Sequence, residues 1–274
     1  MSDQPLEDQL LHRVEDGVAW ITFNRPDAGN AFTQDMRNRM IDLLGAASDS
    51  ADVRAVVIGA AGEKHFCTGA DLRAGRAAQQ ADGAPERATG DAARLIRIGI
   101  QRMIGGILDC EKPVLCALNG TAAGGGAQVV LACDLIVAAE HARIIQVFVR
   151  RGLIPDGGGT YLLPRRVPLQ KAKELIFFGD DLSAADAERI GLVNKVVPAA
   201  ELEAETKKWA TKLAQGPTFA IGLSKRLLNR SLQSDLDTCF AEEAFTQALA
   251  SNSEDMREGI RSFMEKRSPA FKGR

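Results

Sequence analysis

The sequence lacks the features that would place the protein in a membrane or on nucleic acid. Its 274 residues carry 34 lysines and arginines against 36 aspartates and glutamates, so the net charge is −2. Binding a phosphate backbone needs a basic surface, which this balance argues against. No apolar run approaches the roughly 20 residues of a membrane span, and Met1–Pro5 has no basic and apolar signal pattern. We expect no nucleic-acid partner and no membrane attachment.

Cysteine and histidine are also few and scattered. The five cysteines form no C-x-x-C pair, and His12, His65 and His141 have no spacing typical of metal ligands. An odd number of unpaired cysteines predicts reduced thiols in a cytoplasmic protein, and we expect no metal site. The phosphate-binding signature G-x-x-x-x-G-K-[ST] and the nucleophile motif G-x-S-x-G are absent as well.

What the chain does have is an alternation of strand and helix patterns through its first two thirds, typical of an α/β fold. The pattern predicts a hairpin at 10–14 and 18–23 and a helix that begins after an N-cap at Thr33. Strands are expected at 53–59, 113–118 and 134–139, and one continuous helix at 91–108. Residues 73–90 lack a steady period, and we interpret them as a mobile insertion.

The last third of the chain changes character. Apart from a short β-like piece at 192–197, it predicts helices at Leu169–Phe178, Glu201–Gln215, Phe219–Asn229, Asp235–Ala250 and Glu254–Lys266. We therefore divide the chain into an α/β core at 1–197 and a helical region at 198–274. This region either covers the core or meets another subunit.

Two glycine-rich turns are the strongest candidates for a functional site. In the first, Gly124–Gly126 stand between an apolar strand and an apolar helix that we expect to begin near Val129. Glycine lets a ligand approach the backbone closely, and the N–H groups at a helix start favour a negative oxygen. The second turn, 151–160, carries a carboxylate at Asp156. The sequence thus offers backbone donors and one acid.

Six motifs in one order resemble the crotonase superfamily, the enoyl-CoA hydratase/isomerase family. Each motif alone is weak, but their shared order over about residues 10 to 272 is specific. They are Phe23–Pro26 with Asn30–Phe32, Phe66–Leu72, Ala117–Gly120 with Gly124–Gly126, Gly152–Thr160, Ala184–Ala187 with Gly191–Asn194, and Phe263–Arg267.

The resemblance implies a spiral of ββα units with C-terminal helices that cover the site and assemble the chain as a homotrimer or a dimer of trimers. It implies an acyl-CoA thioester as the substrate, with coenzyme A as part of that substrate and no separate cofactor. It also implies that the N–H groups of Ala70 and Gly125 hold the thioester oxygen as negative charge develops there. One such donor is worth roughly 3–4 kcal/mol.

The sequence departs from the hydratases of this family at two positions. Those enzymes use two glutamates to add water to a 2-enoyl thioester, and the matching positions here are Gln128 and Phe148. A glutamine can hold a water molecule but cannot take its proton at neutral pH, and a phenylalanine can do neither. The two-glutamate mechanism is therefore not available as drawn.

Asp156 is the remaining acid, and it matches an aspartate of the family's enoyl-CoA isomerases. A double-bond shift needs one base, an oxyanion hole and no water, so we favour isomerisation with Asp156 as the base. Apolar neighbours such as Phe148, Leu153 and Ile154 would raise its pKa. The alternatives are a hydratase-type activity, nucleophilic attack by Asp156 as in the ring dehalogenases, and a non-catalytic CoA-ester-binding or scaffold protein. Asp156 could also simply cap a helix that begins near Gly158.

The resemblance places further residues along the substrate. Arg25 is interpreted as a partner for CoA phosphates, Asp71 as a residue that orders its loop, and residues 73–90 as a border of the acyl pocket. Phe263 and Lys266 match positions that reach CoA, sometimes from a neighbouring subunit. The full set of expected substrate- or CoA-binding residues is Arg25, Ala28, Thr68, Gly69, Asp71, Leu72, Gln128, Phe148, Phe263 and Lys266.

Overall fold

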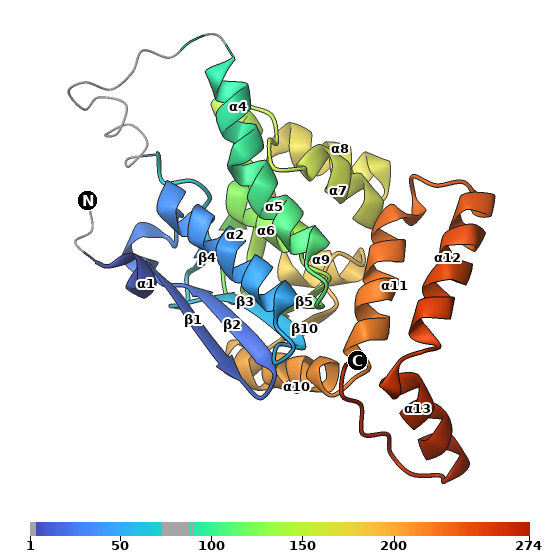
Figure 1. Cartoon of the computed structure of the whole chain (residues 1–274). Helices are drawn as coiled ribbons and strands as arrows, with labels where there is room; N and C mark the ends of the chain where they lie inside the picture. The colour runs from blue at the N-terminus through green and yellow to red at the C-terminus, as the bar shows by residue number, and fades with distance from the viewer. Residues whose placement is uncertain (1–3, 73–87, 89) are drawn as a thin grey trace.

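The computed structural model describes residues 4–72, 88 and 90–274, arranged as two β-sheets enclosed by helices (Figure 1). The insertion expected at 73–90 lies almost entirely outside the described residues. The strands of the larger sheet are β1 (Leu10–Glu15), β2 (Val18–Phe23), β3 (Ala55–Ala60), β5 (Val114–Leu118), β7 (Leu135–Ala139) and β10 (Lys195–Val197). Those of the smaller sheet are β4 (His65–Cys67), β6 (Thr121–Ala123), β8 (Arg143–Ile145) and β9 (Asp181–Ser183).

The chain winds through the two sheets as a spiral. The larger sheet has the order β1-β2-β3-β5-β7-β10 and the smaller has the order β4-β6-β8-β9. β3 and β4, β5 and β6, and β7 and β8 are three successive pairs that each give one strand to each sheet. The α/β spiral is therefore confirmed. Because each strand pair repeats the path of the one before it, loops that are far apart in the sequence come to lie next to each other.

Helices cover both faces of the larger sheet. Those up to the second glycine-rich turn are α1 (Leu6–Gln9), α2 (Gln34–Asp49), α4 (Asp91–Ile98), α5 (Ile100–Asp109) and α6 (Gly125–Ala132), with 3₁₀ turns η1 (Pro26–Ala28) and η2 (Val147–Arg151). The later ones are α7 (Gly159–Arg166), α8 (Leu169–Phe178), α9 (Ala184–Arg189), α10 (Leu202–Ala214), α11 (Thr218–Ser231), α12 (Leu236–Ala250) and α13 (Glu254–Met264), with η3 (Ala199–Glu201).

Strand periodicity decides which core each side chain joins. Val56 and Ile58 of β3 belong to the main core, whereas Ala55 and Val57 point to the opposite face, where α10 packs. This alternation follows from the pleat of a strand, in which neighbouring side chains point to opposite faces. α10 thus packs against the core although it lies beyond residue 197.

Several local predictions hold in the structure. β1 and β2 pair antiparallel, with Glu15 opposite Val18. Thr33 accepts a hydrogen bond from the backbone N–H of Met36 and so caps α2. The helix expected at Leu169–Phe178 has those bounds.

Other predictions need correction. The continuous helix expected at 91–108 is broken at Gly99, whose φ of −101° and ψ of −105° are not helical. A Cβ there would lie 2.7 Å from Cζ of Arg37, so the break is fixed by packing. α6 begins at Gly125, earlier than the expected start near Val129.

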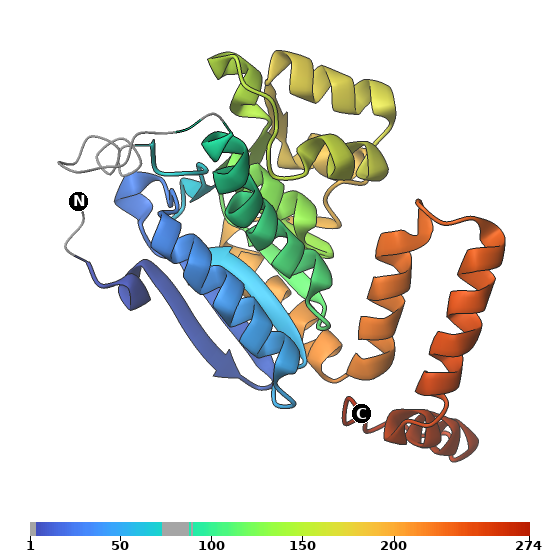
Figure 2. The ribbon, with the colours of Figure 1, turned by 45° about the horizontal axis from the view of Figure 1, so that its top comes forward.

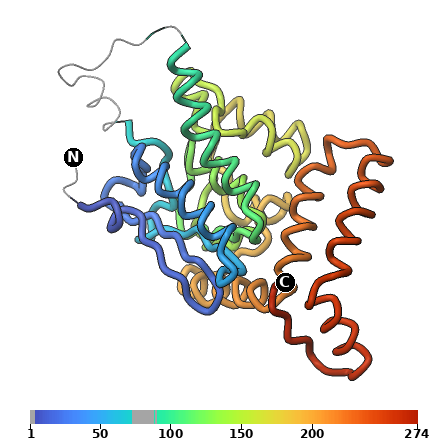
Figure 3. The backbone as a smooth tube through the Cα atoms, in the orientation of Figure 1, coloured from blue at the N-terminus to red at the C-terminus, as the bar shows by residue number. Residues whose placement is uncertain are grey.

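The C-terminal helices α11, α12 and α13 form a layer beside the core (Figure 2). Buried Lys225 docks α11, because its Nζ lies 2.8 Å from Oδ2 of Asp134 and donates to the carbonyl oxygen of Ile107 at 2.9 Å. α12 buries none of its side chains in the single chain. The chain then returns to the start of α11 (Figure 3), where Arg54 donates to the carbonyl oxygen of Phe271 at 3.0 Å. Among the described residues, no helix is long and apolar enough to cross a membrane.

Candidate active site

Two backbone N–H groups come together where the loop after β4 meets the start of α6. A Cβ added to Gly69 would lie 3.0 Å from the backbone N of Gly125, so the two glycines are in close contact. Ala70, the next residue, forms an isolated parallel bridge with Phe32. The hydrogen bonds of the described residues include no acceptor for the N–H of Ala70 or of Gly125. Both groups therefore have a donor left for a ligand.

Neighbouring hydrogen bonds hold the loop that carries Ala70. The N–H of Phe32 donates to the carbonyl oxygen of Gly69, and the N–H of Asp71 donates to the carbonyl oxygen of Phe32, both at 2.9 Å. In a parallel bridge this pattern leaves the N–H of Ala70 directed away from Phe32. The donor is thus preorganised, which is what stabilisation of a developing charge requires.

Close packing leaves little room for a side chain at the first residues of α6. A Cβ on Gly125 would lie 2.8 Å from the Phe32 ring, and a Cβ on Gly126 would overlap the carbonyl group of Cys67. Gly69 has a φ of +97°, which disfavours any residue with a side chain. The positive end of the α6 dipole adds to the attraction for a negative oxygen.

The structure corrects the interpretation of Arg25. Its guanidinium lies 3.0 Å from Oδ2 of Asp71 and donates to the carbonyl oxygen of Ala31 at 2.6 Å. The side chains of Arg25 and Asp71 are only 9% and 12% exposed, so Arg25 joins two loops instead of facing a CoA phosphate in solution. Asp71 orders its loop through this ion pair, as the sequence analysis expected.

Asp156 lies in the turn between η2 and α7. It is half-buried, and burial raises the pKa of its carboxyl, in the direction that the sequence predicts. Gln101 donates from Nε2 to the backbone carbonyl oxygen of Asp156 at 3.1 Å, which helps to fix the turn. α7 begins after Gly158 with no side-chain cap, so the carboxylate is not a helix cap.

Gln128 lies beneath this turn. Its side chain is 0% exposed, and a Cβ on Gly157 would be 3.2 Å from its Cβ and Cγ. A Cβ on Gly159 would be 2.8 Å from Nε2 of Gln128, so the turn needs glycine at both positions. Gln128 follows Gly125 by three residues on α6, so the Asp156 turn packs on the helix whose first residue is Gly125.

A second buried amide completes the support of the turn. Nε2 of Gln128 donates to Oε1 of Gln146 at 2.8 Å, whereas Oε1 of Gln128 and Nε2 of Gln146 have no partner among the described residues. Gln146 is 2% exposed. The sequence analysis missed Gln146 and Gln101, and no motif marks either one.

A cleft of about 690 Å³ opens between α4 and the Asp156 turn. Apolar side chains of Ile96 and Ile154 line it, together with Gln101, Thr160 and two arginines of α4. The carboxylate-bearing residue Asp156 is part of the same wall. The structure thus places the acid in a partly apolar cleft, on a turn that packs against Gln128 of α6.

The other residues that were expected to bind the substrate or CoA lie in different parts of the structure. Ala28, Thr68 and Leu72 are exposed near the Ala70 loop, where Thr68 donates from Oγ1 to the carbonyl oxygen of Gly29 at 3.1 Å. Phe148 is half-buried in η2. Phe263 and Lys266 are exposed on α13 and just beyond it, and within one chain α13 is remote from α4 (Figure 1).

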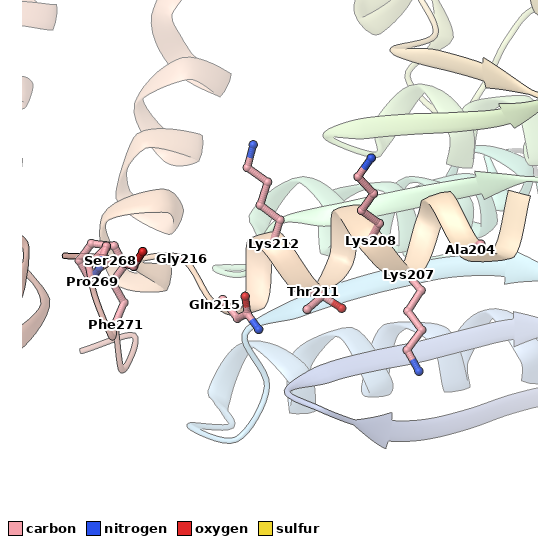
Figure 4. Close-up of a pocket in the computed structure, with 10 residues that line it drawn as sticks. All are labelled: Ala204, Lys207, Lys208, Thr211, Lys212, Gln215, Gly216, Ser268, Pro269 and Phe271. Atoms are coloured by element: carbon pink, nitrogen blue, oxygen red, sulfur yellow. The ribbon is translucent and has the colours of Figure 1, made fainter. Parts of the chain in front are cut away.

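A second hollow lies between α10 and the C-terminal segment (Figure 4). Lys208 and Lys212 extend from one side of α10, while Lys207 points the other way, toward Glu15 of β1 at 3.4 Å. No acid or backbone donor pair of the kind found near Asp156 lines it. Within the described residues, no three His, Cys, Asp or Glu side chains group closely enough to hold a metal ion.

Comparison with known proteins agrees with this geometry. The family model for enoyl-CoA hydratase/isomerase matches residues 13–274. The chain is 36% identical to a 1,2-epoxyphenylacetyl-CoA isomerase of Escherichia coli and 36% identical to a short-chain-enoyl-CoA hydratase of Clostridium acetobutylicum, in each case over 97% of this chain and 98% of the relative. A crystal structure of an enoyl-CoA hydratase from Bacillus anthracis superposes with a TM-score of 0.88 at 31% identity, covering 97% of this chain and 100% of that chain.

Proposed function

The chain belongs to the enoyl-CoA hydratase/isomerase family, and on this premise we propose that it shifts the double bond of an enoyl-CoA thioester with Asp156 as the single base. The observation that carries the proposal is one half-buried carboxylate in a cleft, on a turn that packs on α6, whose first residue Gly125 has an N–H with no acceptor among the described residues. The chain has no acid at position 128 or 148, where the hydratases of this family carry theirs.

The reaction needs one proton to move between two carbons. The carboxylate of Asp156 removes a proton from C2 of a 3-enoyl thioester, and the electron pair delocalises onto the thioester oxygen. The N–H groups of Ala70 and Gly125 hold that oxygen while it is negative. The carboxyl group then returns the proton to C4, which leaves the double bond between C2 and C3. No water is consumed and the carboxylate is regenerated.

The raised pKa of Asp156 suits this task. A base works best when its pKa lies closer to the working pH, because its conjugate acid must hold the proton and then release it. Burial supplies the shift here.

The second candidate is hydration, which the hydratase relatives favour. Water addition needs a group that deprotonates water and one that protonates C2. Gln128 is a buried amide bonded to Gln146, and Phe148 has no proton to give. The third candidate, a CoA-ester-binding protein without catalysis, requires only the donor loops.

Turnover of two substrates separates these functions. Purified protein is incubated with 3-octenoyl-CoA and with 2-octenoyl-CoA, and double-bond shift, water addition and deuterium exchange are followed. We expect the shift to dominate and Asp156→Asn to reduce it at least 10³-fold, whereas the exposed control Asp49→Asn has no effect. An unchanged rate in Asp156→Asn would refute the single-base mechanism, and binding without turnover would favour the non-catalytic function.

We also propose that copies of the chain assemble through the helical region, as a trimer or a dimer of trimers. Leu236 and Phe240 of α12 are 64% and 59% exposed, and such contiguous apolar surface is typical of an interface. Light scattering after size exclusion should give a multiple of the 29.4 kDa chain mass. Leu236→Lys with Phe240→Lys should lower that mass, whereas Ala241→Lys, on another side of the helix, should not. A monomeric wild type would overturn the proposal.

A further inference from the structure

Two arginines of α4 line the same cleft as Asp156. Arg94 and Arg97 are three residues apart, so they share one face of the helix, and both belong to the wall of the cleft. Ile96 and Ile154 give apolar surface to the same wall. Isomerisation at Asp156 requires no cation at this place, so these side chains are not explained by the chemistry of the double-bond shift.

The charges of the two arginines are only partly matched. Arg94 lies 3.0 Å from Oδ1 of Asp91, with its side chain 69% exposed. The guanidinium of Arg97 forms no hydrogen bond or ion pair with any residue that the structure describes. Arg97 is therefore the arginine of this wall that has no ionic partner among the described residues.

The arginines are not partners of the base. A guanidinium close to a carboxylate lowers its pKa, yet the pKa of Asp156 is raised by burial and no arginine offsets the shift. Arg94 and Arg97 lie on α4 and Asp156 lies on the turn across the cleft, and the described residues form no ion pair between them. A substrate that reaches Asp156 with its reactive carbons would extend the rest of its acyl group toward them.

We propose that the substrate is an enoyl-CoA thioester whose acyl group ends in a carboxylate, held at its far end by Arg97 and Arg94. The proposal rests on the proposed function for the identity of the reacting end. A guanidinium presents two parallel N–H donors that match a carboxylate, and this geometry gives specificity as well as attraction. Both arginines are exposed, so salt screens their attraction for a carboxylate.

Asp91 and Asp156 limit which substrates fit the cleft. Asp156 repels a carboxylate placed beside it, so the second carboxylate must stand several carbons from the reactive double bond. Asp91 holds Arg94 in the free protein, which leaves Arg97 as the principal anchor. A neutral acyl chain would reach the same end of the cleft without using either cation.

The test compares two thioesters that differ only at the far end, 3-octenoyl-CoA and 3-octenedioyl-CoA. We expect the wild type to prefer the diacid in kcat/KM by about tenfold or more, as one charge-assisted hydrogen-bond pair allows. Arg97→Gln should reduce that ratio about tenfold, and added salt should reduce it in the wild type. Arg102→Gln, on α5 and outside the wall of the cleft, is the matched control and should keep the ratio.

Binding provides a readout that does not depend on turnover. Titration calorimetry with saturated octanedioyl-CoA and octanoyl-CoA should show the same preference and the same loss in Arg97→Gln. If neither enoyl ester is isomerised but the binding preference is present, the proposed reaction fails and the diacid specificity stands. Equal binding of the two saturated esters by the wild type would overturn the diacid specificity.

The phosphates of coenzyme A are the other anions that could reach an arginine. In that case Arg97→Gln would weaken the binding of both CoA esters equally. The binding of pantetheine thioesters, which lack the nucleotide, would not change. This result would also overturn the proposal. The predicted result is a loss confined to the diacid, in its CoA and pantetheine forms alike.

Discussion

Replacing Gln128 by glutamate tests whether this side chain supports the Asp156 turn or acts on water. The substitution restores the residue type that hydratases of the family carry at this position, with almost no change of shape. In the structure the amide is fully buried and donates from Nε2 to Oε1 of Gln146 at 2.8 Å. A carboxylate cannot donate; Gln146 can turn its amide so that Nε2, which has no partner among the described residues, donates to it, but the buried charge then has a single hydrogen bond.

The size of the effect follows from that contact. A buried polar group without its full set of partners costs about 1–3 kcal/mol, and a charged one costs more. We expect Gln128→Glu to lower the free energy of unfolding by about 2–4 kcal/mol at neutral pH. Protonation of the buried carboxyl restores a donor, so its pKa is raised in the folded state. The destabilisation is therefore smallest at acidic pH and grows as the pH rises.

Two assays measure the outcome. Urea unfolding at pH 5 and pH 8 gives the stability, and incubation with 2-octenoyl-CoA gives the rate of water addition. We expect destabilisation that is larger at pH 8 and no gain of hydration, because Phe148 still supplies no acid. Gln247→Glu, the same change on the exposed side of α12, should alter neither quantity. A stable variant that adds water at least tenfold faster than the wild type would refute this account of Gln128.

Three further predictions test the site and the fold. Because burial raises the pKa of Asp156, the rate of isomerisation should rise with pH along a limb centred above the ordinary value of about 3.9 for aspartate; a profile flat down to pH 4 would contradict this. Gly125→Ala, whose Cβ would meet the Phe32 ring at 2.8 Å, should displace an oxyanion donor and reduce kcat about 10²–10³-fold, as steady-state kinetics will show. Lys225→Met should lower the free energy of unfolding by up to about 3–5 kcal/mol, because Asp134, whose side chain is 20% exposed, loses its ion-pair partner and keeps the hydrogen bond from the N–H of Val114; adding Asp134→Asn should recover part of this loss in a denaturant titration.

Local sequence signals predicted much of the fold. The turn before Val18, the Thr33 cap and the apolar runs of β3, β5 and β7 each act within a few residues, so they can be interpreted from the sequence alone. The helix at 91–108 could not be predicted correctly, because the break at Gly99 depends on the guanidinium of Arg37 on another helix. The early start of α6 likewise depends on packing against Phe32 and Cys67.

The site was predicted to a smaller extent. Motif order pointed to Ala70, Gly125 and Asp156, and the structure brings the first two together and sets the third in the adjoining turn. The ion pair of Arg25 with Asp71 joins loops that are distant in sequence, so nothing local reveals it. The packing of Gln128 beneath Gly157 and Gly159 also joins residues that are distant in sequence, so nothing local reveals it. Both contacts depend on which residues the fold brings together, and the amino-acid composition does not show that.

The central claim is that one carboxylate carries a proton from C2 to C4. Its most direct test is a single turnover of 3-octenoyl-CoA that carries deuterium at C2, in ordinary water, with the product examined by mass spectrometry and NMR. The account predicts deuterium at C4 of the 2-enoyl product in the wild type and no product from Asp156→Asn on the same timescale. Product formation by Asp156→Asn at the wild-type rate, with no deuterium at C4 in either protein, would contradict it.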